Sequence, residues 1–211
     1  MTIGEAILGF TVVAAMLTVI PGLDTTLVLR SALVRGRADA FATALGIVSA
    51  VLLWGAAAAV GAAALLAASE VAYRIVTIGG AAYMAYLGAS MIMRSFTRTA
   101  LAVDETAQPV RGSSWRSFGT GVGTNLLNPK IGVFYIATIP HFIPPDAAPL
   151  AMGLLLALVH DALGMIWFAL IIFGAVWARK WLASARSLRI IDRIAGSVLI
   201  GFGAKLALEQ R

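Results

Sequence analysis

A hydrophobic segment near the N-terminus is interrupted by Pro21 and Gly22 and then carries the carboxylate of Asp24. Proline removes a backbone donor and clashes with the carbonyl four residues earlier, and glycine adds backbone freedom, so a helix over about residues 3–30 should break here. A helix in lipid cannot leave the freed backbone groups unsatisfied. We therefore expect the break to face protein or a water-lined cavity, which suggests a pathway for a solute.

The composition indicates a chain that lies almost entirely in a bilayer. Hydrophobic residues make up 60% of its 211 residues and charged residues only 12%, and its mean hydropathy is +0.91. Soluble domains average about 45–50% apolar and about 25% charged residues, so most of this surface should face lipid. The pattern predicts one integral membrane domain over residues 1–211.

Two further classes of protein are excluded by residue usage. The chain has no cysteine, which removes disulfides, thiolate metal sites and thiol redox chemistry. Its net charge of +6 lies in short clusters between apolar runs. Membrane topology explains such clusters better than nucleic-acid binding, so no nucleic-acid partner is expected.

Six segments are long and apolar enough to be expected to span a bilayer, which takes about 17–25 residues each. The last is the weakest because it contains Asp192, Arg193 and Lys205, so a five-helix arrangement is the alternative. The expected spans cover about residues 3–30, 40–69, 71–93, 117–143, 149–178 and 190–208.

Lysine and arginine residues are divided unevenly between the two sides that these spans define. Only Arg74, Lys205 and Arg211 lie on the side of the two termini, whereas twelve lie in the first, third and fifth connections. Cytoplasmic loops carry an excess of lysine and arginine, so we expect the odd connections in the cytoplasm and both termini outside. The twelve are Arg30, Arg35, Arg37, Arg94, Arg98, Arg111, Arg116, Arg179, Lys180, Arg186, Arg189 and Arg193.

A polar linker over residues 95–116 divides the chain into halves of three helices each, 3–94 and 117–208. Because three is odd, the second half should enter the membrane from the opposite side, as in the inverted repeats of secondary transporters. Each half begins with a helix interrupted by proline, at Pro21-Gly22 and at Asn128-Pro129. The predicted fold is therefore an all-α membrane protein of six transmembrane helices in two inverted halves, with a binding site between the breaks.

Three ionisable residues, Asp24, Lys130 and Asp161, lie well inside apolar segments. A charge at the centre of a membrane helix costs about 2.5–3.5 kcal/mol on insertion scales, so these side chains should face inward, pair or titrate. Asp24 and Lys130 have opposite signs and flank the two breaks. One interpretation is a structural ion pair. The other is that a zwitterionic solute binds between them, with its ammonium on Asp24 and its carboxylate on Lys130 or on the N–H groups of a half-helix.

The amides of Asn125 and Asn128 lie beside the second break. They either satisfy the carbonyl of Asn125, which Pro129 leaves without a donor, or bind solute. The expected binding site combines both breaks with these polar groups. Its residues are Pro21, Gly22, Asp24, Asn125, Asn128, Pro129 and Lys130.

Asp161, preceded by His160, is the candidate for a coupling proton, because a carboxyl in a membrane favours its neutral form and histidine titrates near neutral pH. The alternative is a polar pair satisfied by a neighbouring helix. Without a second histidine or glutamate cluster we expect no metal site and no cofactor. An enzyme is not expected either, since an intramembrane protease would have only Asp24 and Asp161 at its disposal, without the flanking glycine pattern.

Two stretches resemble the signatures of the LysE/RhtB family of bacterial amino-acid exporters. The first is Pro21-Gly22-Leu23-Asp24 followed by residues 31–46, and the second runs from Asn125 through Pro129-Lys130 to Pro140-His141-Phe142. The resemblance implies a six-helix inner-membrane protein, often a homodimer, that exports amino acids or their derivatives in exchange for protons. The alternative is a cation or metal exporter on the same scaffold, with Asp24, His160 and Asp161 as ligands.

Overall fold

The computed structural model describes residues 1–97, 113–182 and 184–208, and its regular elements in these ranges are all helices. The all-α fold class is therefore confirmed for the described residues. The elements are α1 (Ile3–Val19), α2 (Leu23–Val34), α3 (Arg37–Ala68), α4 (Glu70–Thr97), α5 (Ser114–Leu126), α6 (Pro129–Thr138), the 3-10 helix η1 (Ile139–Phe142), α7 (Pro149–Phe173), α8 (Ala175–Leu182) and α9 (Ala185–Leu208).

The predicted first break is confirmed. Helix α1 begins with a capping box, in which the Thr2 hydroxyl accepts from the N–H of Glu5 and the Glu5 carboxylate accepts from the N–H of Thr2. It ends at Val19, two residues before Pro21, and α2 begins at Leu23. The two helices meet at an angle of 53°. Proline and glycine thus set the direction of the chain at this point, as expected from their backbone chemistry.

The second break is confirmed as well. Helix α5 ends at Leu126, and α6 begins with Pro129 at its first position, where a missing N–H costs nothing. Asn128 caps α6 by accepting from the N–H of Lys130 at 3.2 Å. The carbonyl of Asn125 accepts from the backbone N–H of Asn128 at 3.0 Å. Backbone, and not a side-chain amide, therefore satisfies the carbonyl that Pro129 leaves free.

Among the described residues, α3, α4 and α7 are long and apolar enough to cross a membrane, and α1 with α2 makes a fourth span if the bent pair is counted as one. The structure therefore supports three or four spans, and the arrangement of six in two inverted halves stays a prediction. Helix α4 extends to Thr97 and α5 begins at Ser114, which shortens the predicted linker. Residues 98–112 of that linker lie outside the described residues.

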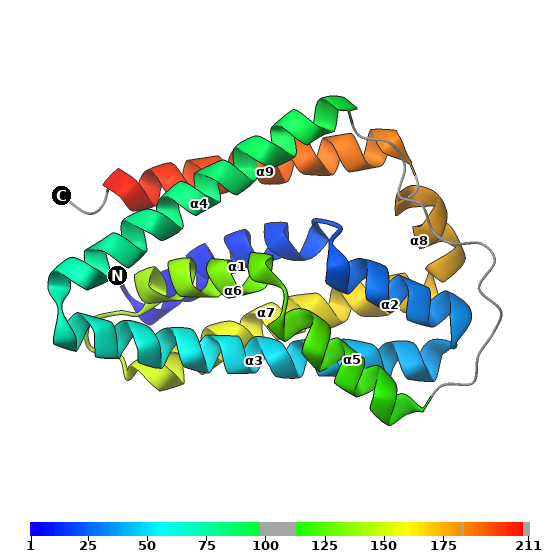
Figure 1. Ribbon diagram of the computed structural model, residues 1–211, viewed down its shortest axis with the longest axis horizontal. Coiled ribbons are helices and arrows are strands. Elements are labelled where there is room, and N and C mark those ends of the chain that lie inside the picture. The colour runs from blue at the N-terminus through cyan, green and yellow to red at the C-terminus, as the bar shows by residue number, and fades with distance from the viewer. Residues whose placement is uncertain (98–112, 183, 209–211) are drawn as a thin grey trace.

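The helices are arranged in layers (Figure 1). Helices α4 and α9 run along each other on one side, α3, α5 and α7 lie on the other, and α1 and α6 lie between them. Glycines allow neighbouring helix backbones to approach closely. For example, a Cβ atom added to Gly88 of α4 would lie only 2.5 Å from the carbonyl oxygen of Gly196 in α9, so only a glycine fits there. Gly55 and Gly153 join α3 to α7 in the same way, each with the other's carbonyl oxygen within 2.8 Å of an added Cβ.

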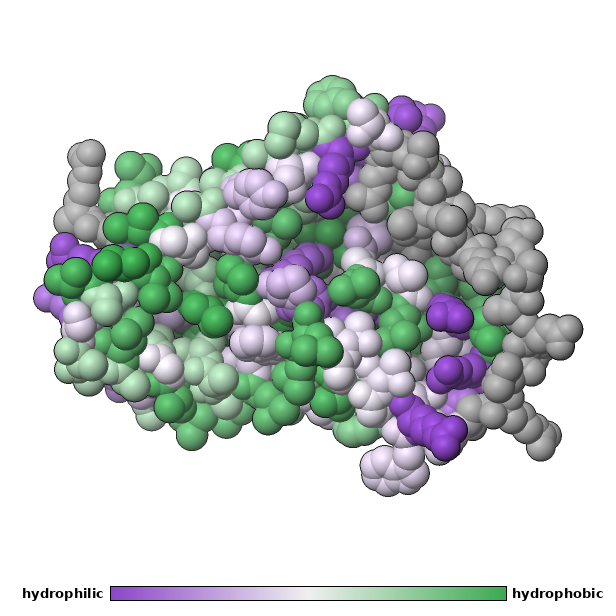
Figure 2. Space-filling model, viewed as in Figure 1, coloured by the Kyte–Doolittle hydropathy of each residue, from purple (hydrophilic) through white to green (hydrophobic). Residues whose placement is uncertain are grey.

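Large apolar side chains are exposed along the outside of the bundle, including Leu8 at 71% and Ile75 at 65%. Figure 2 shows hydrophobic residues over much of one face, with hydrophilic residues gathered near α2 and α5. Such a surface is stable in lipid and not in water. The start of α1 and the end of α9 lie at one end of the molecule, and the turn between α2 and α3, the start of α5 and α8 lie at the other (Figure 1). The protein is a multi-pass membrane protein.

Candidate functional site

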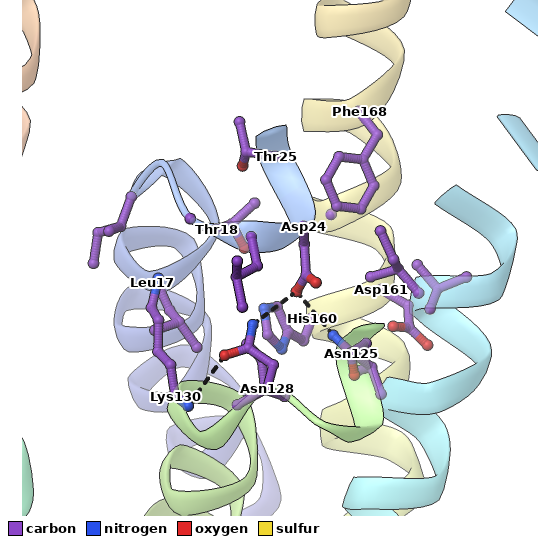
Figure 3. A pocket seen from close by; sticks show the side chains of 18 residues that line it. Leu17, Thr18, Asp24, Thr25, Asn125, Asn128, Lys130, His160, Asp161 and Phe168 are labelled. Atoms are coloured by element: carbon purple, nitrogen blue, oxygen red, sulfur yellow. Dashed lines mark hydrogen bonds between the residues drawn. The ribbon is translucent and has the colours of Figure 1, made fainter. Parts of the chain in front are cut away.

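A cavity of about 50 Å³ lies where the two helix breaks meet, within about 500 Å³ of space between atoms that includes its open mouth (Figure 3). Its walls come from the end of α1, the start of α2, the middle of α3 and α7, and the α5–α6 break. Seven of the predicted site residues line it, namely Gly22, Asp24, Asn125, Asn128, Lys130, His160 and Asp161. Pro21 and Pro129 form the breaks without lining the cavity. Residues from both halves of the chain are thus brought to one place.

Asp24 lies in the first turn of α2 and is held by amides from the other half of the chain. Its Oδ2 atom accepts from the side-chain amide of Asn125 at 2.9 Å and from that of Asn128 at 3.5 Å. Its other oxygen, Oδ1, is buried and has no hydrogen-bond partner. One carboxylate oxygen is therefore held by two amides, and the other is buried with its acceptor capacity unused.

A direct ion pair was one of the two interpretations of Asp24 and Lys130, and the structure forms no ion pair between these two described residues. Asn128 contacts both residues, because its Oδ1 accepts from the backbone N–H of Lys130 and its amide donates to Asp24 (Figure 3). The Lys130 ammonium lies instead beside the first break, where a Cβ atom on Gly22 would be 3.7 Å from Nζ. The Asn128 side chain thus contacts the Asp24 carboxylate and the backbone of Lys130, while the Lys130 ammonium lies beside Gly22.

His160 and Asp161 are consecutive on α7, so their side chains diverge by about 100° around the helix. Nδ1 of His160 lies 2.9 Å from the Tyr135 hydroxyl, and the two rings stack with centroids 5.8 Å apart. Phe10 and Phe134 pack edge-on against the same imidazole. His160 thus has structural partners on α6 and α1. For His160, this agrees with the alternative in which a neighbouring helix satisfies the polar side chain.

Asp161 differs from its neighbour. The residue is buried, and its Oδ1 atom has no hydrogen-bond partner among the described residues. Figure 3 shows its carboxyl on the cavity side of α7, facing the same space as Asp24 and Asn125. A buried carboxyl without a partner is costly and is typical of a group that acts on a ligand or a proton.

Three buried acceptor oxygens on cavity-lining residues lack a hydrogen-bond partner, and they belong to Asp24, Asn125 and Asp161. The cavity also contains one ammonium, from Lys130. A primary ammonium has three donors and no acceptor, and a carboxylate has acceptors alone. The arrangement is therefore complementary to a small molecule that carries both groups.

The same residues do not assemble a metal site. Among the described residues, no group of three or more histidine, cysteine, aspartate or glutamate side chains is placed to hold a metal ion. Nδ1 of His160 is engaged with the Tyr135 hydroxyl. Asp24, His160 and Asp161, the metal ligands of the alternative hypothesis, are therefore not arranged to bind a metal ion in the described structure.

Sequence reasoning missed the contribution of Tyr135 and of the apolar wall. Tyr135 is 25 positions from His160 and on another helix, so no local pattern points to the contact. Gly164 and Phe168 line the cavity beside Asp161, and their spacing of three and seven residues places all three on one face of α7. This helical spacing is the sequence signal that could have identified Gly164 and Phe168 as neighbours of Asp161 in the cavity wall.

Comparison with known proteins agrees with the family resemblance seen in the sequence. The family model of the LysE type translocators matches residues 15–210. The chain is 29% identical to the uncharacterized membrane protein YrhP of Bacillus subtilis, over 97% of this chain and 100% of that protein. It is 27% identical to a leucine efflux protein of Klebsiella pneumoniae, over 96% and 95% of the two chains. It is 26% identical to the threonine efflux protein of Escherichia coli K12, over 90% and 91%. No solved structure matches.

Proposed function

Because the chain belongs to the LysE type translocator family, we propose that it exports an amino acid or a closely related zwitterion across the bacterial inner membrane. The observation that carries this proposal is the set of three unpartnered acceptor oxygens and one ammonium around a single cavity. Relatives that cover most of the chain are named as leucine and threonine efflux proteins, which supports an amino acid as the solute.

In this proposal the solute bridges the two halves of the chain. Its ammonium binds the free oxygens of Asp24 and Asn125, and its carboxylate binds Lys130. Charge-assisted hydrogen bonds are roughly twice as strong as neutral ones. A solute that makes them to both halves in one conformation binds that conformation more tightly and so shifts the population toward it. Alternating access then follows from rocking of six spans in two inverted halves around the site.

The proposed orientation places the arginine-rich end of the bundle in the cytoplasm. Arg35 and Arg37 flank the α2–α3 turn, and Arg116 lies in the first turns of α5 at the same end (Figure 1). Both termini are then outside. A homodimer, which the family resemblance implies, is part of the same proposal.

Export against a gradient needs an energy source, and we assign the coupling proton to Asp161, with His160 beside it. Asp161 is buried, faces the cavity and has an unpartnered oxygen. In this cycle the carboxyl takes up a proton when the site faces outward and the solute leaves, and it releases that proton to the cytoplasm when the site faces inward and binds the next solute.

Efflux from proteoliposomes tests the function. Vesicles containing the full chain are loaded with labelled leucine, threonine, alanine, lysine or glutamate, and loss of label is compared with vesicles containing Asp24→Asn. We expect at least one amino acid to leave faster through the wild type. If none does and a divalent cation leaves instead, the cation-exporter alternative replaces this proposal.

A further inference from the structure

Ten of the described glycines are buried, and nine of them have an obvious packing role. A Cβ atom on any of the nine would come closer than 3.0 Å to a neighbouring helix or side chain, so each glycine is needed for close contact. Gly55 and Gly196 are examples, with the nearest atoms 2.6 Å from the added Cβ in both cases. The nine are Gly46, Gly55, Gly80, Gly88, Gly121, Gly132, Gly153, Gly196 and Gly203.

Gly164 is the exception. It is buried in α7, yet a Cβ atom there would meet only Cε2 of Phe168, at the ordinary van der Waals distance of 3.9 Å. Helix packing therefore does not require a glycine at this position. Glycine in the interior of a helix is destabilising relative to alanine, so its presence here needs another reason.

The space that Gly164 leaves open belongs to the cavity. Gly164 lies three residues after Asp161, which places it about 4.5 Å further along α7, and Phe168 follows one turn later on the same face. Ile47 and Val51 of α3 complete this part of the lining, and both are buried. The cavity thus has a charged end at Asp24, Lys130 and Asp161 and an apolar end at Gly164.

We propose that Gly164 and Phe168, with Ile47 and Val51 opposite, form the subsite for the side chain of the transported amino acid, and that Gly164 sets the size of side chain that fits. This inference rests on the proposed function. It assigns the subsite to uncharged, aliphatic side chains, because these four residues offer no hydrogen-bonding group. Each additional carbon at residue 164 removes space that the solute would occupy.

The direct test narrows the subsite by substitution. Gly164→Ala and Gly164→Val are reconstituted as full-length protein, and efflux of labelled alanine, valine and leucine is measured. One methylene in an apolar pocket changes discrimination by about 10- to 200-fold. We expect the ratio of leucine flux to alanine flux to fall by about 10-fold or more in Gly164→Val, with a smaller fall in Gly164→Ala. Phe168→Ala should shift the ratio in the opposite direction and admit phenylalanine.

Ala162→Val is the matched control, since it adds carbon atoms to an exposed position of the same helix and should leave the ratio unchanged. Thermal stabilisation of the detergent-solubilised variants by leucine and by alanine gives a second readout that does not depend on flux. An unchanged ratio in both readouts, with wild-type protein that exports amino acids, overturns the subsite and leaves the function standing. Absence of amino-acid export by the wild type overturns the proposed function and the subsite with it.

Discussion

Asn125 donates its side-chain amide to Oδ2 of Asp24 at 2.9 Å, a contact between residues 101 positions apart. It joins the break in the first half of the chain to the break in the second. The amide occupies one oxygen and leaves the other unpartnered, so the contact positions the carboxylate without using all of its acceptors.

Removal of this amide should weaken the site more than the fold. Hydrogen bonds to charged groups contribute about 1.5–3 kcal/mol, so Asn125→Ala should raise the substrate concentration for half-maximal efflux by about 10-fold or more. Flux measurements in proteoliposomes over a range of internal substrate check this. Normal affinity in Asn125→Ala would mean that Asp24 is positioned without it.

Asn128→Ala offers a useful contrast. Asn128 makes the longer bond to Asp24, at 3.5 Å, but also caps α6. Loss of an N-cap costs about 0.5–2 kcal/mol, so we expect a lower melting temperature in detergent together with a smaller change in affinity than in Asn125→Ala. Equal effects of the two variants on both quantities would argue against separate roles.

The sequence predicted both helix breaks because their cause is local. Proline lacks an N–H wherever it stands, and Pro21 and Pro129 end or begin helices as expected. The sequence also predicted that the charged residues inside apolar segments would face inward, because charge facing lipid is costly. Seven of the predicted site residues line one cavity. The partners of those residues were not predictable in the same way. The contacts of Asp24 with Asn125 and Asn128 join residues 101 and 104 positions apart, so they depend on how the helices pack.

The glycine contacts give a prediction about stability. In α4, Gly88 touches the backbone of α9 while Gly79 has nothing within 4 Å. Overpacking costs about 1–3 kcal/mol, so Gly88→Ala should lower the melting temperature of the solubilised protein. Gly79→Ala is the control on the same helix and should leave it unchanged or raise it, because alanine favours a helix. Equal melting temperatures would show that α4 and α9 tolerate separation.

The chain lacks cysteine, which makes labelling a clean test of topology. Ser113→Cys precedes α5 and Asp146→Cys lies between η1 and α7, and both positions are exposed. With six spans, a membrane-impermeant maleimide should label Asp146→Cys in intact spheroplasts and Ser113→Cys only after permeabilisation. Labelling of both from the same side would overturn the arrangement in two inverted halves.

Substitution of both charged residues distinguishes a binding role from a structural one. The variant with Asp24→Asn and Lys130→Met removes one negative and one positive charge from the cavity and leaves its net charge unchanged, so it should accumulate and melt near the wild-type temperature. It should not transport, because neither end of a zwitterion finds its counter-charge. Flux near the wild-type rate in this variant would show that the solute binds elsewhere.

Asp161→Asn tests the assignment of the coupling proton. Asparagine keeps the size of the side chain and cannot exchange a proton, so the variant should fold and should still bind the solute at Asp24 and Lys130. We expect exchange of labelled for unlabelled amino acid across the vesicle membrane to continue, whereas accumulation driven by an imposed pH gradient should fall by about 10-fold or more. Exchange carries no net proton, so it needs only the binding site and the conformational change. His160→Gln is the companion variant. Since His160 contacts Tyr135 at 2.9 Å, its loss should lower the melting temperature while leaving part of the gradient-driven transport. If Asp161→Asn still accumulates substrate at the wild-type level, the proton is carried by another group, and Asp24 is the next carboxyl to substitute.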